Sequence, residues 1–109
     1  MNEASAANGR RLGEWLRAVR QAKETPLRVV AAAADMDTAL LSKIELGQRL
    51  PTEEQTDRLA RFLGLDAEAL QARRIADRFR QEYQERPAAK AAIMMLAEEA
   101  GVYRTRTGR

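Results

Sequence analysis

The chain contains no cysteine and no histidine. Without cysteine it can form no disulfide and no thiolate metal site, and it has no thiol nucleophile. Without histidine it lacks the side chain whose charge changes near neutral pH, which excludes imidazole acid–base catalysis. We therefore expect no metal, no cofactor and no catalytic residue, and we predict that the protein is not an enzyme.

Carboxylates are the remaining route to catalysis. Two adjacent pairs occur, Glu53–Glu54 and Glu98–Glu99. Neighbouring residues on a helix point about 100° apart, so neither pair can share a site. We interpret both pairs as solvated helix faces, and no small-molecule ligand is evident from the sequence.

Aromatic residues and proline are also scarce, with Trp 1, Tyr 2, Phe 2 and Pro 3. This scarcity, beside abundant alanine, leucine, arginine and glutamate, favours helices over strands. No run approaches the roughly 18 apolar residues of a membrane span. The opening "MNEASAANGRR" lacks the apolar core of a signal peptide. We expect an all-α protein in the cytoplasm with no membrane partner.

The 109 residues are 45% hydrophobic and 32% charged, with a net charge of +3. These values are typical of one globular domain with a short appendage, and the charge permits nucleic-acid binding without requiring it. Residues 1–9 are small and polar, and we predict that they are flexible. Residues 102–109 include Arg104, Arg106 and Arg109, a basic tail that would add salt-sensitive attraction to DNA.

Hydrophobic periodicity predicts six helices. The first begins near Asn8 or Gly9 and is ended by "KETP". The others are predicted over residues 26–34, 38–46, 53–63, 66–85 and 88–100. On the fourth of these six helices, Leu59, Phe62 and Leu63 are expected to face inward.

Local residue types also predict how the helices begin and end. Asp35 is expected in a left-handed turn conformation, and Asp37 and Thr52 as N-caps of the helices that follow them. Gly47 and Gly64 are expected to end two helices.

Two of these short helices, joined by "DMD", have the pattern of a helix-turn-helix. Ala31 is the small residue needed where the second helix crosses the first. The apolar residues around it are predicted to interlock: Val30, Ala34, Met36, Leu41 and Ile44. If Ala31 and Ile44 are buried, the segment 38–43 must face outward, where a helix can enter the major groove of DNA.

Three strings, "LGEWLRAVRQAK", "LLSKIELGQRLPT" and "TDRLARFLGLD", resemble the Cro/C1-type helix-turn-helix domain of the XRE family. The resemblance spans about residues 12–65 and departs from the family pattern at Leu27 and Asp35. It implies a lambda-repressor-like five-helix domain over residues 10–70, followed by a C-terminal helical extension over residues 71–101. It also implies a sequence-specific regulator of transcription that binds double-stranded DNA through helix 38–46, as a dimeric repressor.

The resemblance further implies a structural ion pair between Arg20 and Glu45. Their neighbours agree with it, because Arg20 follows the apolar Val19 and Glu45 follows the apolar Ile44. Both side chains should therefore be partly buried, and we interpret Arg20 as structural and not as a DNA ligand.

The candidate DNA-binding residues lie on the outward side of the motif: Arg28, Thr38, Ala39, Ser42, Lys43, Gln48 and Arg49. Lys43 is the candidate reader of guanine, and Ala39 can pack on a thymine methyl group. Arg28, Gln48 and Arg49 are candidate phosphate contacts. Each has a plain alternative as a solvated or helix-start residue, and the operator sequence cannot be derived from them.

Four leucines near the motif favour a second hypothesis, in which the fold serves as a protein-interaction module such as an antitoxin holding a toxin. They are Leu27, Leu40, Leu46 and Leu50. The sequence does not distinguish a prophage repressor, a restriction–modification controller and an antitoxin, or a repressor from an activator.

The C-terminal third carries a heptad-like stripe on the predicted fifth helix, made of Leu65, Ala69, Ala72, Ala76, Phe79 and Tyr83. Four arginines on the same helix are expected to form a solvated face: Arg73, Arg74, Arg78 and Arg80. The predicted last helix is apolar nearly all round, which favours a homodimer over packing within the monomer. The predicted dimer interface is Phe79, Tyr83, Ile93, Met94, Met95 and Leu96.

Overall fold

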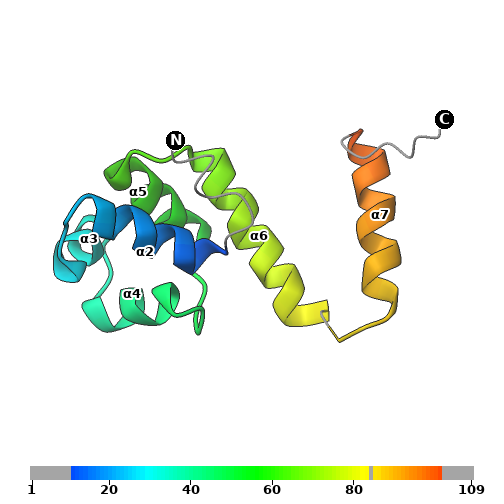
Figure 1. Cartoon of the computed structure of the whole chain (residues 1–109), viewed down its shortest axis with the longest axis horizontal. Helices are drawn as coiled ribbons and strands as arrows, with labels where there is room; N and C mark the ends of the chain where they lie inside the picture. The colour runs from blue at the N-terminus through cyan, green and yellow to red at the C-terminus, as the bar shows by residue number, and fades with distance from the viewer. Residues whose placement is uncertain (1–10, 84, 102–109) are drawn as a thin grey trace. The chain divides into compact units, whose positions relative to one another are not determined.

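The computed structural model describes residues 11–83 and 85–101. All regular structure among these residues is helical, which confirms the predicted all-α class (Figure 1). The helices are α2 (Leu12–Ala22), α3 (Leu27–Ala33), α4 (Thr38–Glu45), α5 (Glu53–Leu63), α6 (Ala67–Tyr83) and α7 (Ala88–Ala100). The predicted flexible N-terminus, 1–9, and basic tail, 102–109, lie outside the described residues.

The helix ends follow from the residues at them. Thr52 accepts a hydrogen bond from the N–H of Gln55 while the Gln55 side chain accepts from the N–H of Thr52, which is a capping box. Gly64 ends α5 with a φ of 73°, as predicted. Glu24 ends α2 with a φ of 51°, a left-handed conformation in a residue that is not glycine. Its N–H donates to the carbonyl of Gln21. Pro26 is the N-cap of the next helix, α3.

The chain divides into two compact units, residues 1–78 (unit 1) and 79–109 (unit 2). In unit 1, α3 packs on α4 and α5, and α2 packs on α4. These helices and the first part of α6 form one bundle in Figure 1. They enclose a core of Leu12, Trp15, Leu16, Val19, Val30, Ala31, Ala34, Leu41, Ile44, Leu59, Ala60, Leu63, Leu65 and Leu70.

Buried polar groups attach α6 to the rest of unit 1. The carboxylate of Asp77 accepts a hydrogen bond of 3.0 Å from the N–H of Leu12, at the start of α2. The amide of Gln71 donates to the carbonyl of Glu53 and to the carboxylate of Asp57, both at 2.9 Å. These contacts join α6 to both α2 and α5.

The buried face of α6 is different from its heptad-like stripe. The buried residues are Leu70, Gln71 and Asp77, and Ala72 of the predicted stripe is exposed. Arg73 lies with its guanidinium 5.6 Å from the centre of the Trp15 ring, and Arg74 donates to the side-chain oxygen of Gln71 at 2.8 Å. The expectation that these two arginines belong to a solvated face was therefore wrong.

Phe62 was also predicted incorrectly, since 46% of it is exposed. The inward face of α5 is instead made of Thr56, Leu59, Ala60 and Leu63. Thr56 fits in the core because its hydroxyl donates to the carbonyl of Thr52 at 2.7 Å.

Unit 2 contains the end of α6, a short connection and α7. Its described residues include none that is buried. Helix α7 ends at Gly101, which has a φ of 75°. No described helix is both long and apolar enough to cross a membrane.

Candidate nucleic-acid interface

The turn between α3 and α4 is built as the "DMD" string predicts. Asp35 has a φ of 58°, which places it in the left-handed region. The N–H of Met36 donates to the carbonyl of Ala31, and the N–H of Asp35 donates to that of Ala32. This pair of bonds is a Schellman motif, which ends α3 and turns the chain toward α4. Asp37 then caps α4 by accepting from the N–H of Leu40 at 2.7 Å.

Burial at this turn confirms the interlocking of α3 with α4. Ala31 and Ile44 are each 1% exposed, and Ala34 and Leu41 are fully buried. Since these side chains fix one face of α4 against the core, the opposite face must point outward.

Helix α2 also packs against α4, and the two backbones come close together at Gly13. A β-carbon added at Gly13 would lie 2.3 Å from the carbonyl oxygen of Ile44 and 2.6 Å from that of Glu45. No side chain can be accommodated at such distances without moving one of the helices. Gly13 therefore sets how closely α2 approaches the C-terminal end of α4.

Arg20 and Glu45 form the second link between α2 and α4. Arg20 Nε and Nη2 donate to the two Glu45 carboxylate oxygens at 2.7 and 3.0 Å, and Nη1 donates to the carbonyl of Thr25 at 3.1 Å. The side chains are 15% and 7% exposed. The hydrogen bond to Glu45 raises the pKa of Arg20 above its ordinary value, although burial opposes the shift. This pair holds the end of α4, and it directs three of the five N–H donors of Arg20 to partners within unit 1.

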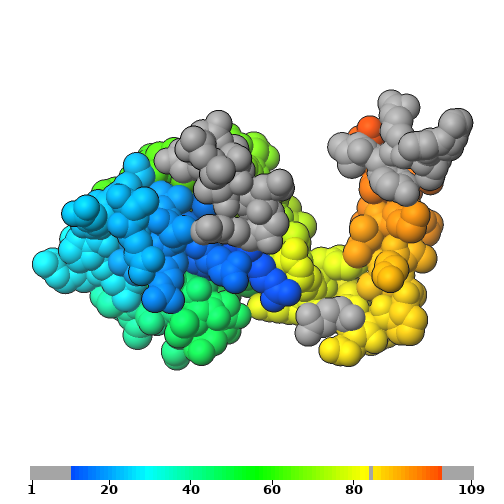
Figure 2. Space-filling view, viewed as in Figure 1, coloured from blue at the N-terminus to red at the C-terminus, as the bar shows by residue number. Residues whose placement is uncertain are grey.

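The outward face of α4 carries the four candidate base-contacting residues. Thr38, Ala39 and Lys43 are exposed, and Ser42 is half-buried. In the space-filling view α4 forms part of the surface of unit 1 (Figure 2). The arrangement presents one cation, two hydroxyl groups and one methyl group on a single helical face.

The candidate phosphate contacts flank this face. Arg28 lies in the first turn of α3, and Gln48 and Arg49 follow α4; all three are exposed. The N-terminus of α4 itself is already occupied by the Asp37 carboxylate. Repulsion between like charges disfavours a phosphate at that end of the helix.

The four leucines that favour the protein-interaction hypothesis do not form an exposed surface on which another protein could dock. Leu27, Leu40 and Leu50 are partly buried and pack against the core. Leu46 is 59% exposed. Three of the four leucines therefore serve the fold of unit 1.

Sequence reasoning missed Gly13, Gln71 and Asp77, although they fix the helices that position α4. Gly13 had a readable signal, because an isolated glycine within an amphipathic helix often marks a close approach of backbones. Gln71 and Asp77 had none, since their partners lie 14 to 65 residues away along the chain.

No group of three or more metal-ligating side chains occurs among residues 11–83 and 85–101. A family model described as a helix-turn-helix domain matches residues 11–73, more than half of the chain. The searches of curated proteins and of solved structures found no match.

Proposed function

Because the chain belongs to the helix-turn-helix domain family, we propose that it is a sequence-specific DNA-binding regulator of the Cro/C1 type. In this proposal α4 enters the major groove and the protein acts in the cytoplasm. The observation that carries the proposal is the burial of Ala31 and Ile44, which leaves Thr38, Ala39 and Lys43 exposed on one face.

The proposed base contacts are few. Lys43 reads guanine, Thr38 and Ser42 donate or accept single hydrogen bonds, and Ala39 contacts a thymine methyl group. Since a bidentate contact gives about 1–3 kcal/mol of discrimination, one such face supplies limited specificity by itself. Arg28, Gln48 and Arg49 position the helix through phosphates.

A homodimer would compensate for this limited reading surface. We propose that it forms through unit 2, where Tyr83, Ile93, Met94, Met95 and Leu96 are between 43% and 62% exposed. Adjacent to Tyr83, the ring of Phe79 lies with its centre 5.0 Å from that of Tyr83. A two-fold dimer presents two copies of α4 about 34 Å apart, one DNA turn, to a pseudo-palindromic operator. Such a dimer would repress transcription by occluding a promoter.

A fluorescence anisotropy titration tests DNA binding. A duplex selected from a random pool is compared with a random duplex of equal length, at about 50 and about 200 mM salt. We expect the selected duplex to bind at least about 1,000-fold more tightly, and both affinities to fall as salt rises. Equal affinities for the two duplexes, or affinities independent of salt, would contradict the proposal.

In the same assay, single substitutions distinguish residues that contact bases from residues that contact phosphates. Lys43→Ala should weaken binding to the selected duplex about tenfold or more, with a smaller effect on the random duplex. Arg49→Ala should weaken both by a similar factor and reduce the salt dependence. Arg61→Ala, an exposed cation on α5, is the matched control and should change neither.

The protein-interaction hypothesis is a weaker candidate. It depends on four leucines near the motif, and of these Leu27, Leu40 and Leu50 are partly buried and pack against the core. The exposed Leu46 alone does not make an apolar patch of the size used for protein recognition.

A further inference from the structure

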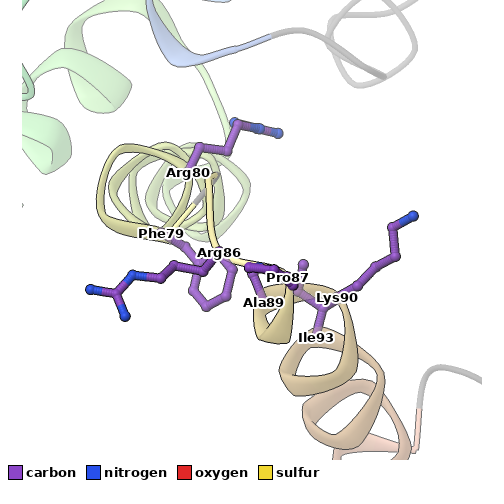
Figure 3. Close-up of a pocket in the computed structure, with 7 residues that line it drawn as sticks. All are labelled: Phe79, Arg80, Arg86, Pro87, Ala89, Lys90 and Ile93. Atoms are coloured by element: carbon purple, nitrogen blue, oxygen red, sulfur yellow. The ribbon is translucent and has the colours of Figure 1, made fainter.

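Unit 2 contains an open recess where the end of α6 meets the start of α7. Its volume is about 480 Å³, within the usual range of ligand sites. The apolar part of its lining comes from the Phe79 ring and from Pro87, Ala89 and Ile93. Figure 3 shows the Phe79 ring, Pro87 and Ile93 along the same side of the connection between the two helices. The Phe79 ring is supported by its contact with the Tyr83 ring, at 5.0 Å between centres.

Among the described residues, the charged side chains that line the recess are all cationic. They are Arg80, Arg86 and Lys90, and no carboxylate of residues 11–83 or 85–101 belongs to the lining. Within the part of the chain that the structure describes, Arg86 and Lys90 form no ion pair. In Figure 3 the two side chains extend to either side of the apolar lining. An apolar surface flanked by cations is complementary to a molecule that has an apolar body and an anionic group.

We propose that this recess binds a small amphipathic anion, in which an apolar chain or ring system carries one carboxylate or sulfonate. The apolar body packs on Phe79, Pro87 and Ile93. The anionic group pairs with Arg86 or Lys90, which are exposed and can reorient toward it.

The position of the recess gives this binding a regulatory consequence, which rests on the proposed function. Phe79 and Ile93 line the recess and also belong to the proposed dimer interface. A ligand that covers them competes with the second copy of the chain, so it shifts the protein toward the monomer. The monomer has one copy of α4 and binds the operator less tightly. The anion is thus an inducer that releases the repressor from DNA.

Titration with 1-anilinonaphthalene-8-sulfonate, whose fluorescence rises on binding, tests the site. The wild type is compared with Arg86→Glu/Lys90→Glu, in which two exposed cations are reversed, and with the matched control Lys23→Glu/Arg61→Glu in unit 1. We expect about tenfold weaker binding for the first double variant and unchanged binding for the control. Equal weakening in both variants would show that only net charge matters and would overturn the site. Absence of binding to the wild type would also overturn it.

Competition then identifies the class of ligand. Octanoate, which has both a chain and a carboxylate, should displace the fluorescent probe. Acetate lacks the apolar chain and 1-octanol lacks the charge, so each should compete at least about tenfold less well. Equal competition by octanoate and 1-octanol would overturn the role of the cations.

Sedimentation velocity with and without saturating octanoate tests the regulatory step separately. We expect octanoate to raise the monomer fraction. If octanoate displaces the probe but leaves the dimer unchanged, the proposed competition between the ligand and the second copy of the chain is overturned, while the anion site stands. If the protein is monomeric without octanoate, the proposed dimer fails, and the result of the probe titration is unaffected.

Discussion

The two units of the chain place their apolar side chains in opposite environments. In unit 1 most large apolar residues are buried, with Leu46, Phe62 and Ile75 as the exposed exceptions. In the described part of unit 2 no residue is buried, and four consecutive residues of α7, from Ile93 to Leu96, are 47% to 62% exposed.

This difference distinguishes the residues that stabilise the fold, in unit 1, from the residues available for contact with other molecules, in unit 2. Unit 1 has a closed core with polar links between α2, α4, α5 and α6, so its fold is complete within one chain. The described part of unit 2 leaves apolar surface exposed, a feature typical of an interaction site. Substitutions inside unit 1 should therefore change the free energy of unfolding, whereas substitutions on α7 should change association. The following experiments test this contrast in order of decreasing effect.

The largest effect is expected from Glu45→Ala. The substitution leaves the Arg20 guanidinium, which is 15% exposed, without its carboxylate partner. The free energy of unfolding should fall by about 4 kcal/mol. The exposed pair Glu54–Arg58, at 2.9 Å, provides the control, because Glu54→Ala should cost no more than about 0.5 kcal/mol. Urea unfolding followed by the fluorescence of Trp15, the single tryptophan, measures both. Equal losses would mean that burial gives the Arg20–Glu45 pair no special weight.

Gly13→Ala is expected to cost about 3 kcal/mol, because the new methyl group overlaps two carbonyl oxygens of α4. Gly47→Ala is the matched glycine variant. Gly47 has no atom near its missing β-carbon but has a φ of 80°, so that substitution should cost only about 1 kcal/mol. If the two variants unfold at the same urea concentration, the close approach of α2 to α4 is not as described.

Asp77→Ala should cost about 2 kcal/mol, since the buried N–H of Leu12 loses its acceptor. Asp66→Ala removes an exposed cap of the same helix, whose carboxylate accepts from the N–H of Ala69 at 3.0 Å, and should cost about 1 kcal/mol. Differential scanning calorimetry compares the two. A smaller loss for Asp77→Ala would mean that α6 is not anchored to α2 through this bond.

The smallest effect on unfolding is expected from Ile93→Asp/Leu96→Asp on α7. In dilute protein the unfolding transition reported by Trp15 should move by no more than about 0.5 kcal/mol, because neither side chain is buried. Sedimentation equilibrium should nevertheless show loss of the dimer. A clear destabilisation of unit 1 would instead favour the alternative in which α7 packs within the monomer.

Local signals in the sequence were sufficient for most of the helices and their ends. The start of α2 is an exception, because this helix begins at Leu12 with Arg11 as its N-cap and not near Asn8 or Gly9. Asp35, Asp37, Gly47, Thr52 and Gly64 have the conformations or caps that their residue types predict. Each depends on neighbours within four residues, which is why single-sequence reasoning succeeds there. The burial of the α3–α4 contact was predictable for a similar reason, since small and apolar residues recur at helical spacing.

Which side chains of a longer helix are buried was less predictable. Leu59 has two apolar neighbours one turn on, Phe62 and Leu63, and periodicity alone does not tell which one is buried. On α6 the buried Gln71 and Asp77 are polar, so a pattern of apolar residues could not identify them as buried. Their burial depends on partners in other helices, which only the folded chain brings near. The recess in unit 2 is likewise a tertiary feature, and the sequence had suggested no ligand.

The proposed function requires that the outward face of α4 contacts DNA. A ¹H–¹⁵N correlation NMR titration with a selected duplex measures this contact residue by residue. We expect the largest shift changes at the backbone amides of Thr38, Ala39, Ser42 and Lys43, with smaller changes at Arg28, Gln48 and Arg49. Changes concentrated on α7, with those four amides unaffected, would contradict it.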